Sequence, residues 1–396
     1  MNEGSDHIGP RNIEKRLTSE SPSPSLESNS KKKLLLVGPL PPPNVGPTTA
    51  FKIFCDEVKR YPDIEIEIVD ISAKHLKKKT NWFSPSTWAH SLRVIHQFFP
   101  AFLQKPDCVL IFCSYGFLLS MGPLLVGTAK MAGEPCFIRP FAGSLDEYYE
   151  GLSFPFKPLL AAVLGGVDGI FIQTTALYEY FKPLLGNRVY YVPNYRYISS
   201  SQSSEQVNYY VEDDKELELV YVGAIREDKG VFVLLDSLKM IAGNCKEAQI
   251  SCDFYGPIHS EDERRFHNNI SGVHNARYKG VLQPDHIIAT MQRYDLLVLP
   301  TYHLGEGHPG VIIEAMAAGI PVITTNFRSI PDLVQDGENG LLIIPKDTTS
   351  LMQAIETVYH NRDLLRKMAE HSREKYDRYD VQHIVRHVLH WCGVID

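Results

Sequence analysis

The sequence predicts an α/β protein with two domains, each built around a doubly wound parallel sheet. Short apolar runs of strand type alternate with helical patterns in both halves of the chain, which is typical of parallel sheets covered by helices. The chain has 396 residues, 44% of them hydrophobic, which is enough for two ordinary cores and unusual for one. In such folds the functional residues follow the carboxyl ends of the strands.

The elements of the N-terminal half follow from its apolar runs. Strands are predicted at 33–37, 64–71, 109–112, 136–139, 169–173 and 189–192. A loop rich in Pro and Gly, 38–47, precedes a predicted helix at 48–59. Residues 108–129 carry no charge and are long enough to span a bilayer. However, Gly116 and the Gly122-Pro123 pair divide them, which favours a buried strand followed by a helix that ends near Gly133.

The C-terminal half repeats the pattern. Strands are predicted at 219–222, 296–299 and 322–324, and helices at 231–241, 311–318 and 379–391, with a loop at 305–310. Domain boundaries follow from composition. We expect a disordered tail at 1–30, a first domain at 31–195, a polar linker at 196–215, a second domain at 216–379 and a final segment at 380–396.

Two glutamates flank the predicted loop that opens the helix at 311–318. Glu306 lies in the loop, and Glu314 interrupts the apolar run of the helix. The unpaired amides from Gly310 to Ile313 can bind an anionic group. Carboxylates would repel that group, so we interpret both glutamates as acceptors for hydroxyls beside it. A sugar and a ribose that flank a diphosphate fit this description, although a helix-opening acid favoured by the dipole is the alternative for Glu314.

A second segment has the context that a phosphate site requires. Residues 218–230 predict a buried strand, a glycine turn at Gly223, a polar loop that contains Arg226 and Lys229, and then a helix. A lone loop lysine is more often a solvated charge. Together with the Glu306 segment, Lys229 is favoured as a phosphate ligand.

These segments resemble the retaining, nucleotide-sugar-dependent glycosyltransferases of family 4 (group 1), which have the GT-B fold of two Rossmann-like domains facing each other across a cleft. The family pattern E-x7-E followed by A-M-A-x-G-x-P-V matches Glu306 to Val322. The resemblance implies an acceptor domain at 31–195, to which 380–396 crosses back, and a donor domain at 216–379. It implies that Glu306 contacts the transferred sugar and Glu314 the ribose. It also implies that Lys229 neutralises the diphosphate, and that Pro309, Gly310 and Val311 help to bind the donor.

The chain departs from the family pattern at three positions. Ala224 stands where the family has the arginine of G-R-x-x-x-x-K-G, so Arg226 is the candidate for the missing cation. Pro47 replaces the second glycine of the first loop, which leaves Gly46 as the diphosphate contact there. Ala142 replaces a histidine that contacts the donor sugar.

Other candidates for the site depend on position alone. His308 could touch the donor sugar, although a loop histidine is more often exposed and idle. Asp146 and Glu147 could orient acceptor hydroxyls, although acids at a helix start are equally common. No D-x-D sequence occurs, and the histidines near Glu306 lack metal-ligand spacing, so we expect no metal and no cofactor.

Charge and cysteine content indicate the compartment and the partners. The seven cysteines are odd in number, show no C-x-x-C spacing and mostly lie in apolar runs, which predicts a reduced, cytoplasmic protein without a signal peptide. The net charge of −7 and the absence of nucleic-acid-binding motifs argue against nucleic acid. A basic cluster precedes three aromatic residues: Lys74, Lys77, Lys78 and Lys79, then Trp82, Phe83 and Trp88. Such a cluster favours peripheral contact with the inner face of an anionic membrane, and a solvated loop is the alternative.

The predicted function is hexosyl transfer, with retention of configuration, from a nucleotide-sugar to a glycan or lipid-linked acceptor in surface polysaccharide biosynthesis. Two alternatives share the fold. A nucleotide-sugar 2-epimerase would need an acid/base pair and no acceptor. A degenerate scaffold would bind the nucleotide-sugar without turnover, and Ala224 and Ala142 keep that alternative open.

Overall fold

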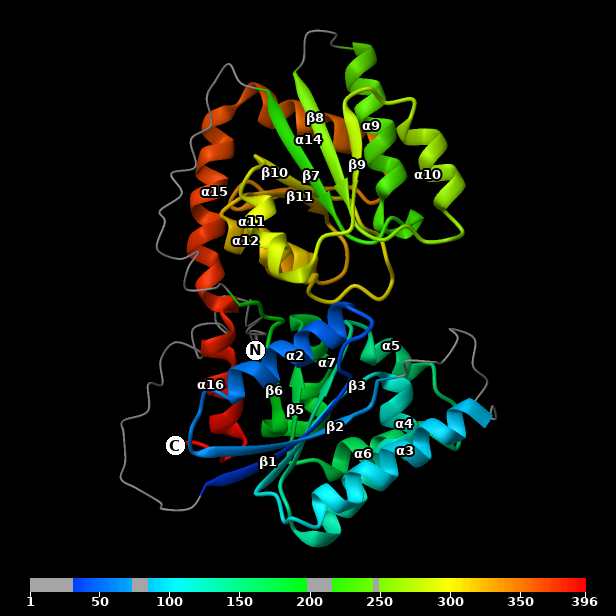
Figure 1. Cartoon of the computed structure of the whole chain (residues 1–396), viewed down its shortest axis with the longest axis vertical. Coiled ribbons are helices and arrows are strands. Elements are labelled where there is room, and N and C mark those ends of the chain that lie inside the picture. Colours follow the sequence, from blue (N-terminus) through cyan, green and yellow to red (C-terminus); the bar gives the residue numbers. More distant parts are fainter. Residues whose placement is uncertain (1–30, 73–84, 198–215, 245–248) are drawn as a thin grey trace, which may run out of the picture. The chain divides into compact units, whose positions relative to one another are not determined.

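The computed structural model describes residues 31–72, 85–197, 216–244 and 249–396 (Figure 1). They form two compact units, which we call the N-terminal unit (residues 1–193 and 381–396) and the C-terminal unit (residues 194–380). The predicted tail, the cluster from Lys74 to Phe83, Cys245 and most of the linker lie outside the described residues.

The N-terminal unit contains a six-stranded sheet in the order β2-β1-β3-β4-β5-β6, in which every pairing is parallel. Its strands are β1 (Lys32–Gly38), β2 (Ile64–Asp70), β3 (Cys108–Cys113), β4 (Cys136–Pro140), β5 (Gly169–Ile172) and β6 (Val189–Tyr191). Its helices are α2 (Gly46–Val58), α3 (Pro85–Phe102), α4 (Tyr115–Ala132), α5 (Leu145–Glu150), α6 (Phe156–Gly166), α7 (Thr175–Leu185), the 3-10 turn η1 (Gly186–Arg188) and α16 (Val381–Trp391).

The C-terminal unit contains a second parallel six-stranded sheet, in the order β12-β11-β10-β7-β8-β9. Its strands are β7 (Leu217–Val222), β8 (Ile250–Tyr255), β9 (Ala276–Gly280), β10 (Leu296–Leu299), β11 (Val322–Thr325) and β12 (Gly340–Ile343). Its helices are α9 (Val231–Asn244), α10 (Glu263–Ile270), α11 (Ile287–Met291), α12 (Gly310–Ala318), α13 (Ile330–Leu333), α14 (Thr348–His360), α15 (Arg362–Tyr376) and the 3-10 turns η2 (Glu227–Lys229), η3 (Pro284–His286) and η4 (Asp377–Tyr379).

The two parallel sheets confirm the predicted fold class. The uncharged run 108–129 forms buried β3 followed by α4, which ends at the left-handed Gly133 as predicted. Among the helices of the described residues, none has the length and apolarity of a membrane span. Two predicted loops are too long at their C-terminal ends, because α2 already begins at Gly46 and α12 at Gly310. A glycine at a first helical position is hard to distinguish from loop by pattern alone.

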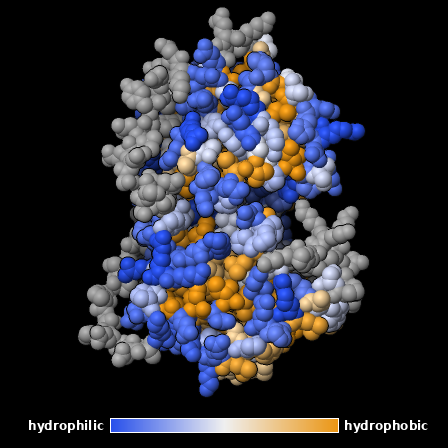
Figure 2. Space-filling view, in the orientation of Figure 1, coloured by the Kyte–Doolittle hydropathy of each residue, from blue (hydrophilic) through white to orange (hydrophobic). Residues whose placement is uncertain are grey.

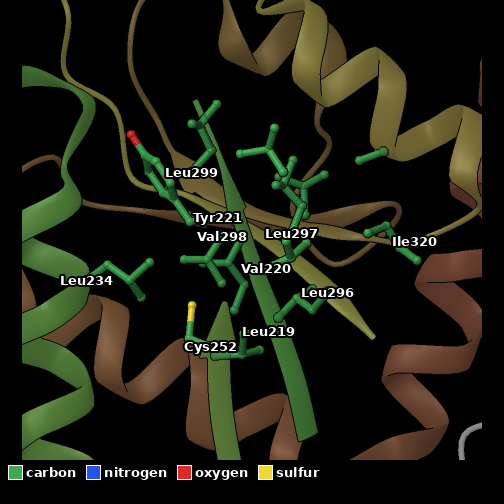
Figure 3. Close-up of a cluster of buried hydrophobic side chains, with 14 of the residues drawn as sticks. Leu219, Val220, Tyr221, Leu234, Cys252, Leu296, Leu297, Val298, Leu299 and Ile320 are labelled. Carbon is green, nitrogen blue, oxygen red and sulfur yellow. The ribbon is translucent and has the colours of Figure 1, made fainter. Parts of the chain in front are cut away.

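The core of the C-terminal unit holds the carboxyl ends of two central strands in place. Figure 3 shows side chains of β7 and β10, including Leu219, Tyr221 and Leu297, packed together with Leu234 of α9. These four side chains are fully buried. The Tyr221 hydroxyl leaves the apolar cluster and donates to the carbonyl of Ala224 at 2.8 Å, so it fixes the turn after β7. The loops that follow β7 and β10 therefore start from a rigid base.

The strand order identifies where a ligand would bind. From β7 the chain continues to β8 and β9 on one side, whereas β10, β11 and β12 extend on the other. The order therefore reverses between neighbouring β7 and β10, and crevices at such reversals are the usual ligand sites of open α/β sheets. Lys229 follows β7, and Glu306 follows β10.

Candidate active site

A glycine brings the loop after β7 close to the end of β10. Gly230 ends η2 in the left-handed conformation, with φ of 76°. A Cβ at this position would lie 2.0 Å from the carbonyl oxygen of Pro300, so only glycine permits the approach. The amide of Tyr302 donates to the carbonyl of Asp228 at 2.9 Å and joins the same two loops. Lys229 is thereby held beside the loop that carries Glu306.

Lys229 and Glu306 form an ion pair through Nζ and Oε1. The Thr301 hydroxyl donates to the same oxygen of Glu306 at 2.9 Å. The Glu306 side chain is 8% exposed and that of Lys229 is 20% exposed, so the pair is largely shielded from water. The structure therefore brings together the two residues with the most specific predicted roles, the sugar contact and the phosphate cation.

The Arg226 guanidinium is held by neighbouring side chains and so is not free to bind a phosphate. It pairs with both carboxylate oxygens of Asp228, and Nη2 lies 3.0 Å from Nδ1 of His303. His303 Nδ1 is also 2.9 Å from Oδ2 of Asp228. Burial opposes ionisation of Asp228, but the interactions with Arg226 and His303 outweigh it and lower the pKa of the carboxyl. The carboxylate therefore holds Arg226 in place.

The N-terminus of α12 offers unpaired amides. Pro309 precedes the helix and provides no side-chain cap. Within the described residues, the amides of Gly310 and Val311 have no hydrogen-bond acceptor, and both residues are partly accessible. These amides and the positive end of the helix dipole form a favourable environment for an anion.

Glu314 lies one turn into α12 and is paired with an arginine that the sequence did not indicate. Nε of Arg196 donates to Oε1 of Glu314 at 2.6 Å. Glu314 is 9% exposed and Arg196 is 6% exposed. Glu314 is thus more than a favourable acid at a helix start, because it is a buried, oriented carboxylate.

His308 is buried, which differs from the exposed loop histidine considered as the alternative. Its Nε2 lies 3.2 Å from Oδ2 of Asp332 in α13, and its carbonyl accepts a hydrogen bond from Asn194 at 2.9 Å. The side chain has no exposed surface. In this arrangement His308 braces the loop before α12.

The remaining predicted site residues lie in turns. Gly223 follows β7, and its amide already donates to the carbonyl of Tyr255 at 3.0 Å. In the N-terminal unit, Gly46 is the first residue of α2, and a Cβ added there would meet nothing within 4 Å. Asp146 and Glu147 lie in the first turn of α5. Ala142 has a φ of 71°, a conformation that L-residues adopt rarely.

Comparison with known proteins identifies the C-terminal part of the chain. Residues 203–375 match the family model described as Glycosyl transferases group 1. The match covers less than half of the chain, so it shows a similarity to this family in that segment. The segment contains Lys229, Glu306 and Glu314, and so most of the predicted site lies within the matched domain.

One curated relative covers a larger part of the chain. A putative teichuronic acid biosynthesis glycosyltransferase, TuaC of Bacillus subtilis, is 29% identical over 251 residues, which is 62% of this chain and 60% of the relative. The chain spans less than two thirds of the length of the curated relatives that it matches.

Solved structures share the fold over nearly the whole chain. Sucrose-phosphate synthase of Thermosynechococcus elongatus superposes with a TM-score of 0.69 at 14% identity, over 90% of this chain and 97% of its own. Anabaena Alr3699/HepE in complex with UDP gives 0.65 at 16% identity, over 91% and 98%. At such identities these likenesses establish the fold alone, and that fold is GT-B.

Three polar residues near the group 1 motifs escaped the sequence analysis, namely Arg196, Thr301 and Asp228. Thr301 and Asp228 lie within the two motif-bearing loops, so their closeness to Glu306 and Arg226 in sequence is the signal that could have found them. Arg196 precedes Glu314 by 118 residues, and its only local signal is a charge in the short segment that follows β6.

Proposed function

We propose that this protein transfers a hexosyl unit from a nucleotide-sugar to a glycan or lipid-linked acceptor, with retention of configuration, in surface polysaccharide biosynthesis. The observation that carries the proposal is the Lys229–Glu306 pair beside the α12 N-terminus, with Glu314 one turn further on. The group 1 match supports the class of reaction. The relative's printed role in teichuronic acid biosynthesis supports a polysaccharide product.

The chemistry assigns a task to each group. In the donor, the bond between the anomeric carbon and the phosphate oxygen breaks, and the nucleoside diphosphate leaves with the added negative charge. Lys229 and the amides of Gly310 and Val311 stabilise that charge. Glu306 accepts a hydrogen bond from the sugar, and Glu314 accepts one from the ribose. The acceptor oxygen attacks the same face, and its proton passes to a phosphate oxygen of the leaving group, so no enzymic nucleophile is required.

Donor binding must rearrange the ion pair between Lys229 and Glu306. Lys229 can approach the phosphate only if it loosens its contact with Glu306, and Glu306 then becomes free to accept from the sugar. The two substrate contacts are therefore coupled. A donor that provides both the sugar and the diphosphate satisfies both partners, whereas either fragment alone leaves one charge unpaired.

The first experiment is a thermal-shift panel of UDP, GDP and ADP, each with its common sugars, on the wild type, Glu314→Ala and the exposed control Glu370→Ala of α15. Binding raises the melting temperature by mass action. We expect one nucleotide family to stabilise the wild type and the control but not Glu314→Ala. No shift with any donor would contradict the proposal and favour a degenerate scaffold.

Turnover with the donor so identified separates the remaining alternatives. We expect release of the nucleoside diphosphate that depends on acceptor, survives EDTA and yields a product with the anomeric configuration of the donor, as determined by NMR. A changed sugar without an acceptor product would indicate a 2-epimerase. Loss of turnover in EDTA would contradict metal-independent catalysis.

We further propose a cytoplasmic enzyme that attaches to the inner face of an anionic membrane. The lysines at 77–79 are outside the described residues, but α3, which follows them, exposes apolar side chains (Figure 2). Trp88 and Leu92 are 60% and 62% exposed, and Phe99 and Leu103 continue the same side at helical spacing. Aromatic and apolar side chains beside a basic cluster are suited to an anionic lipid surface.

Liposome flotation tests the attachment. We expect binding to vesicles that contain anionic lipid, weakened when Lys77, Lys78 and Lys79 are changed to Glu and when Trp88 and Leu92 are changed to Ser. The matched charge control is Lys367→Glu on exposed α15. Unchanged flotation of both sets of variants would refute the proposal.

A further inference from the structure

The backbone of Arg196 is anchored within the C-terminal unit. Its amide donates to the carbonyl of Tyr379 at 3.1 Å, and its carbonyl accepts from the Tyr376 hydroxyl at 3.0 Å. A bridge pairs it with Asp380 in parallel orientation. Arg196 is therefore a fixed part of this unit, although it lies at the start of the predicted linker.

The side chain of Arg196 lies against the first residue of α12. A Cβ at Gly310 would be 1.4 Å from Nη2 and 2.2 Å from Cζ of Arg196. The guanidinium thus fills the space that a side chain at position 310 would occupy. It is aimed at the same N-terminal turn whose amides lack acceptors.

The donors of Arg196 are only partly used. Nε donates to Glu314 at 2.6 Å, and Nη1 donates to the carbonyl of Tyr195 at 2.8 Å. Among the described residues, Nη2 has no hydrogen-bond acceptor, although the residue is only 6% exposed. Nη2 is not one of the fully enclosed atoms without a partner, so this N–H of a largely buried guanidinium stays accessible to an anionic or polar ligand.

The charge balance of the site also indicates a role for this arginine. Lys229 and Arg226 are paired with Glu306 and Asp228, and position 224 holds alanine. A nucleoside diphosphate brings several negative charges to the place where the strand order reverses, between β7 and β10. Within the described part of the site, Arg196 is the cation that combines a fixed position with a donor left open next to the α12 amides.

We propose that Arg196 is a donor-binding residue, whose Nη2 binds the phosphate at the N-terminus of α12 and supplies the cation that Ala224 lacks. Its Nε meanwhile holds Oε1 of Glu314, which leaves Oε2 for a ribose hydroxyl. The rigid guanidinium fork suits this double task, because one planar group donates in two directions. This inference rests on the proposed function, since it requires a nucleotide donor at the site.

The test compares a nucleoside with its diphosphate. Calorimetric titrations give both affinities for the wild type, Arg196→Gln, Arg196→Lys and the exposed control Arg264→Gln of α10. The nucleoside reports the base and ribose contacts, and the diphosphate adds the phosphate contacts. We expect Arg196→Gln to weaken diphosphate binding by about 10- to 100-fold and to change nucleoside binding by less than about twofold. Arg196→Lys should lie between, because lysine lacks the fork.

Two further variants keep the test decisive. If Arg196→Gln alone unfolds because Glu314 is left unpaired, Arg196→Gln/Glu314→Gln is compared with Glu314→Gln. Arg196→Gln/Ala224→Arg restores a cation at the family position and should recover part of the diphosphate affinity. Equal losses for nucleoside and diphosphate, or no loss, would overturn the inference while the proposed function stands. Failure of the wild type to bind any nucleotide would overturn both.

Discussion

At the residue scale, the site is built from three pairs of opposite charges, of which Lys229–Glu306 and Arg196–Glu314 are largely shielded from water. Lys229 pairs with Glu306, Arg196 with Glu314, and Arg226 with Asp228. Removing one partner of a buried pair leaves the other charge uncompensated, which costs more than losing both. The pairs therefore connect stability and function, and a single substitution should affect both.

The Lys229–Glu306 pair provides the first prediction. Lys229→Met should lower the unfolding free energy by about 3 kcal/mol and turnover by roughly 100-fold or more, because Glu306 loses its countercharge and the diphosphate its cation. Glu306→Gln in the same background should restore part of the stability but none of the turnover. Urea unfolding and donor turnover measure the two effects.

The exposed Lys367→Met serves as the control, since its removal should change neither quantity appreciably. Strict additivity of the two site substitutions in stability would show that the pair has no coupling, contrary to the geometry.

At the element scale, the N-terminus of α12 combines an anion-binding turn with a tight contact. Gly310 is required because the Arg196 guanidinium occupies the place of its side chain. The loop before the helix is braced by His308 and by Ser329, whose hydroxyl donates to the carbonyl of Gly307 at 2.8 Å. The helix therefore starts at a defined place without a side-chain cap.

Gly310→Ala provides the second prediction. In an ordinary helix this change stabilises by about 0.5 to 1 kcal/mol, but here the Cβ displaces Arg196 and breaks its bond to Glu314. We expect the unfolding free energy to fall by about 2 kcal/mol instead, because a hydrogen bond between charged groups contributes about that much and the Arg196–Glu314 bond is lost. Chemical denaturation measures the difference.

Gly243→Ala in α9 is the matched control in the same unit. Nothing lies within 4 Å of a Cβ at Gly243, so this variant should be neutral or slightly stabilised. If the two alanine variants behave alike, the close contact at Gly310 does not exist in solution.

At the scale of the whole molecule, the cysteines within the described residues are part of the core. Cys55, Cys108, Cys113, Cys136, Cys252 and Cys392 are all buried and free. Burial raises the pKa of Cys113 to about 12. For Cys55, burial is likewise the largest cause that raises the pKa to about 12. Buried neutral thiols of this kind are unreactive, which agrees with the predicted core role.

These thiols make stability sensitive to alkaline pH, which is the third prediction. In the unfolded chain these thiols have their ordinary pKa of about 9.0, whereas in the folded N-terminal unit burial raises the pKa to about 12. The folded state thus keeps its protons longer, and its stability is full below pH 9 and falls as the pH rises toward 12. Each thiol contributes a slope of up to about 1.4 kcal/mol per pH unit.

Urea unfolding at pH 8 and pH 10 measures the slope, and Cys113→Ala provides the comparison. The variant is less stable at pH 8 because the substitution leaves a cavity. Its unfolding free energy should, however, fall less steeply with pH, because the contribution of the Cys113 thiol is missing. An unchanged slope would show that Cys113 ionises equally in both states.

The sequence alone determined the fold class and the loops that carry the chemistry. Both depend on local patterns: apolar runs of strand length, glycine turns, and the spacing between Glu306 and Glu314. These patterns can be recognised in a single sequence because the strands of a parallel sheet are buried on both faces and their side chains are therefore apolar. The residues of a motif also stay close to one another in any fold that contains it. Hence the strand at 296–299 was predicted to the residue. Two helix starts were shifted where glycine opens the helix, and the helix predicted from 379 begins at Val381, after the 3-10 turn η4.

Only the tertiary structure decided which charges meet. Lys229 reaches Glu306 because the reversed strand order makes β7 and β10 neighbours and Gly230 lets their loops touch. Arg226 is held by Asp228 and His303, His308 is buried, and Arg196 lies on Gly310. Local periodicity carries no information about such distant pairs, because their geometry depends on how whole elements pack. The same packing shields the Lys229–Glu306 and Arg196–Glu314 pairs from water, and this burial makes the loss of either partner costly.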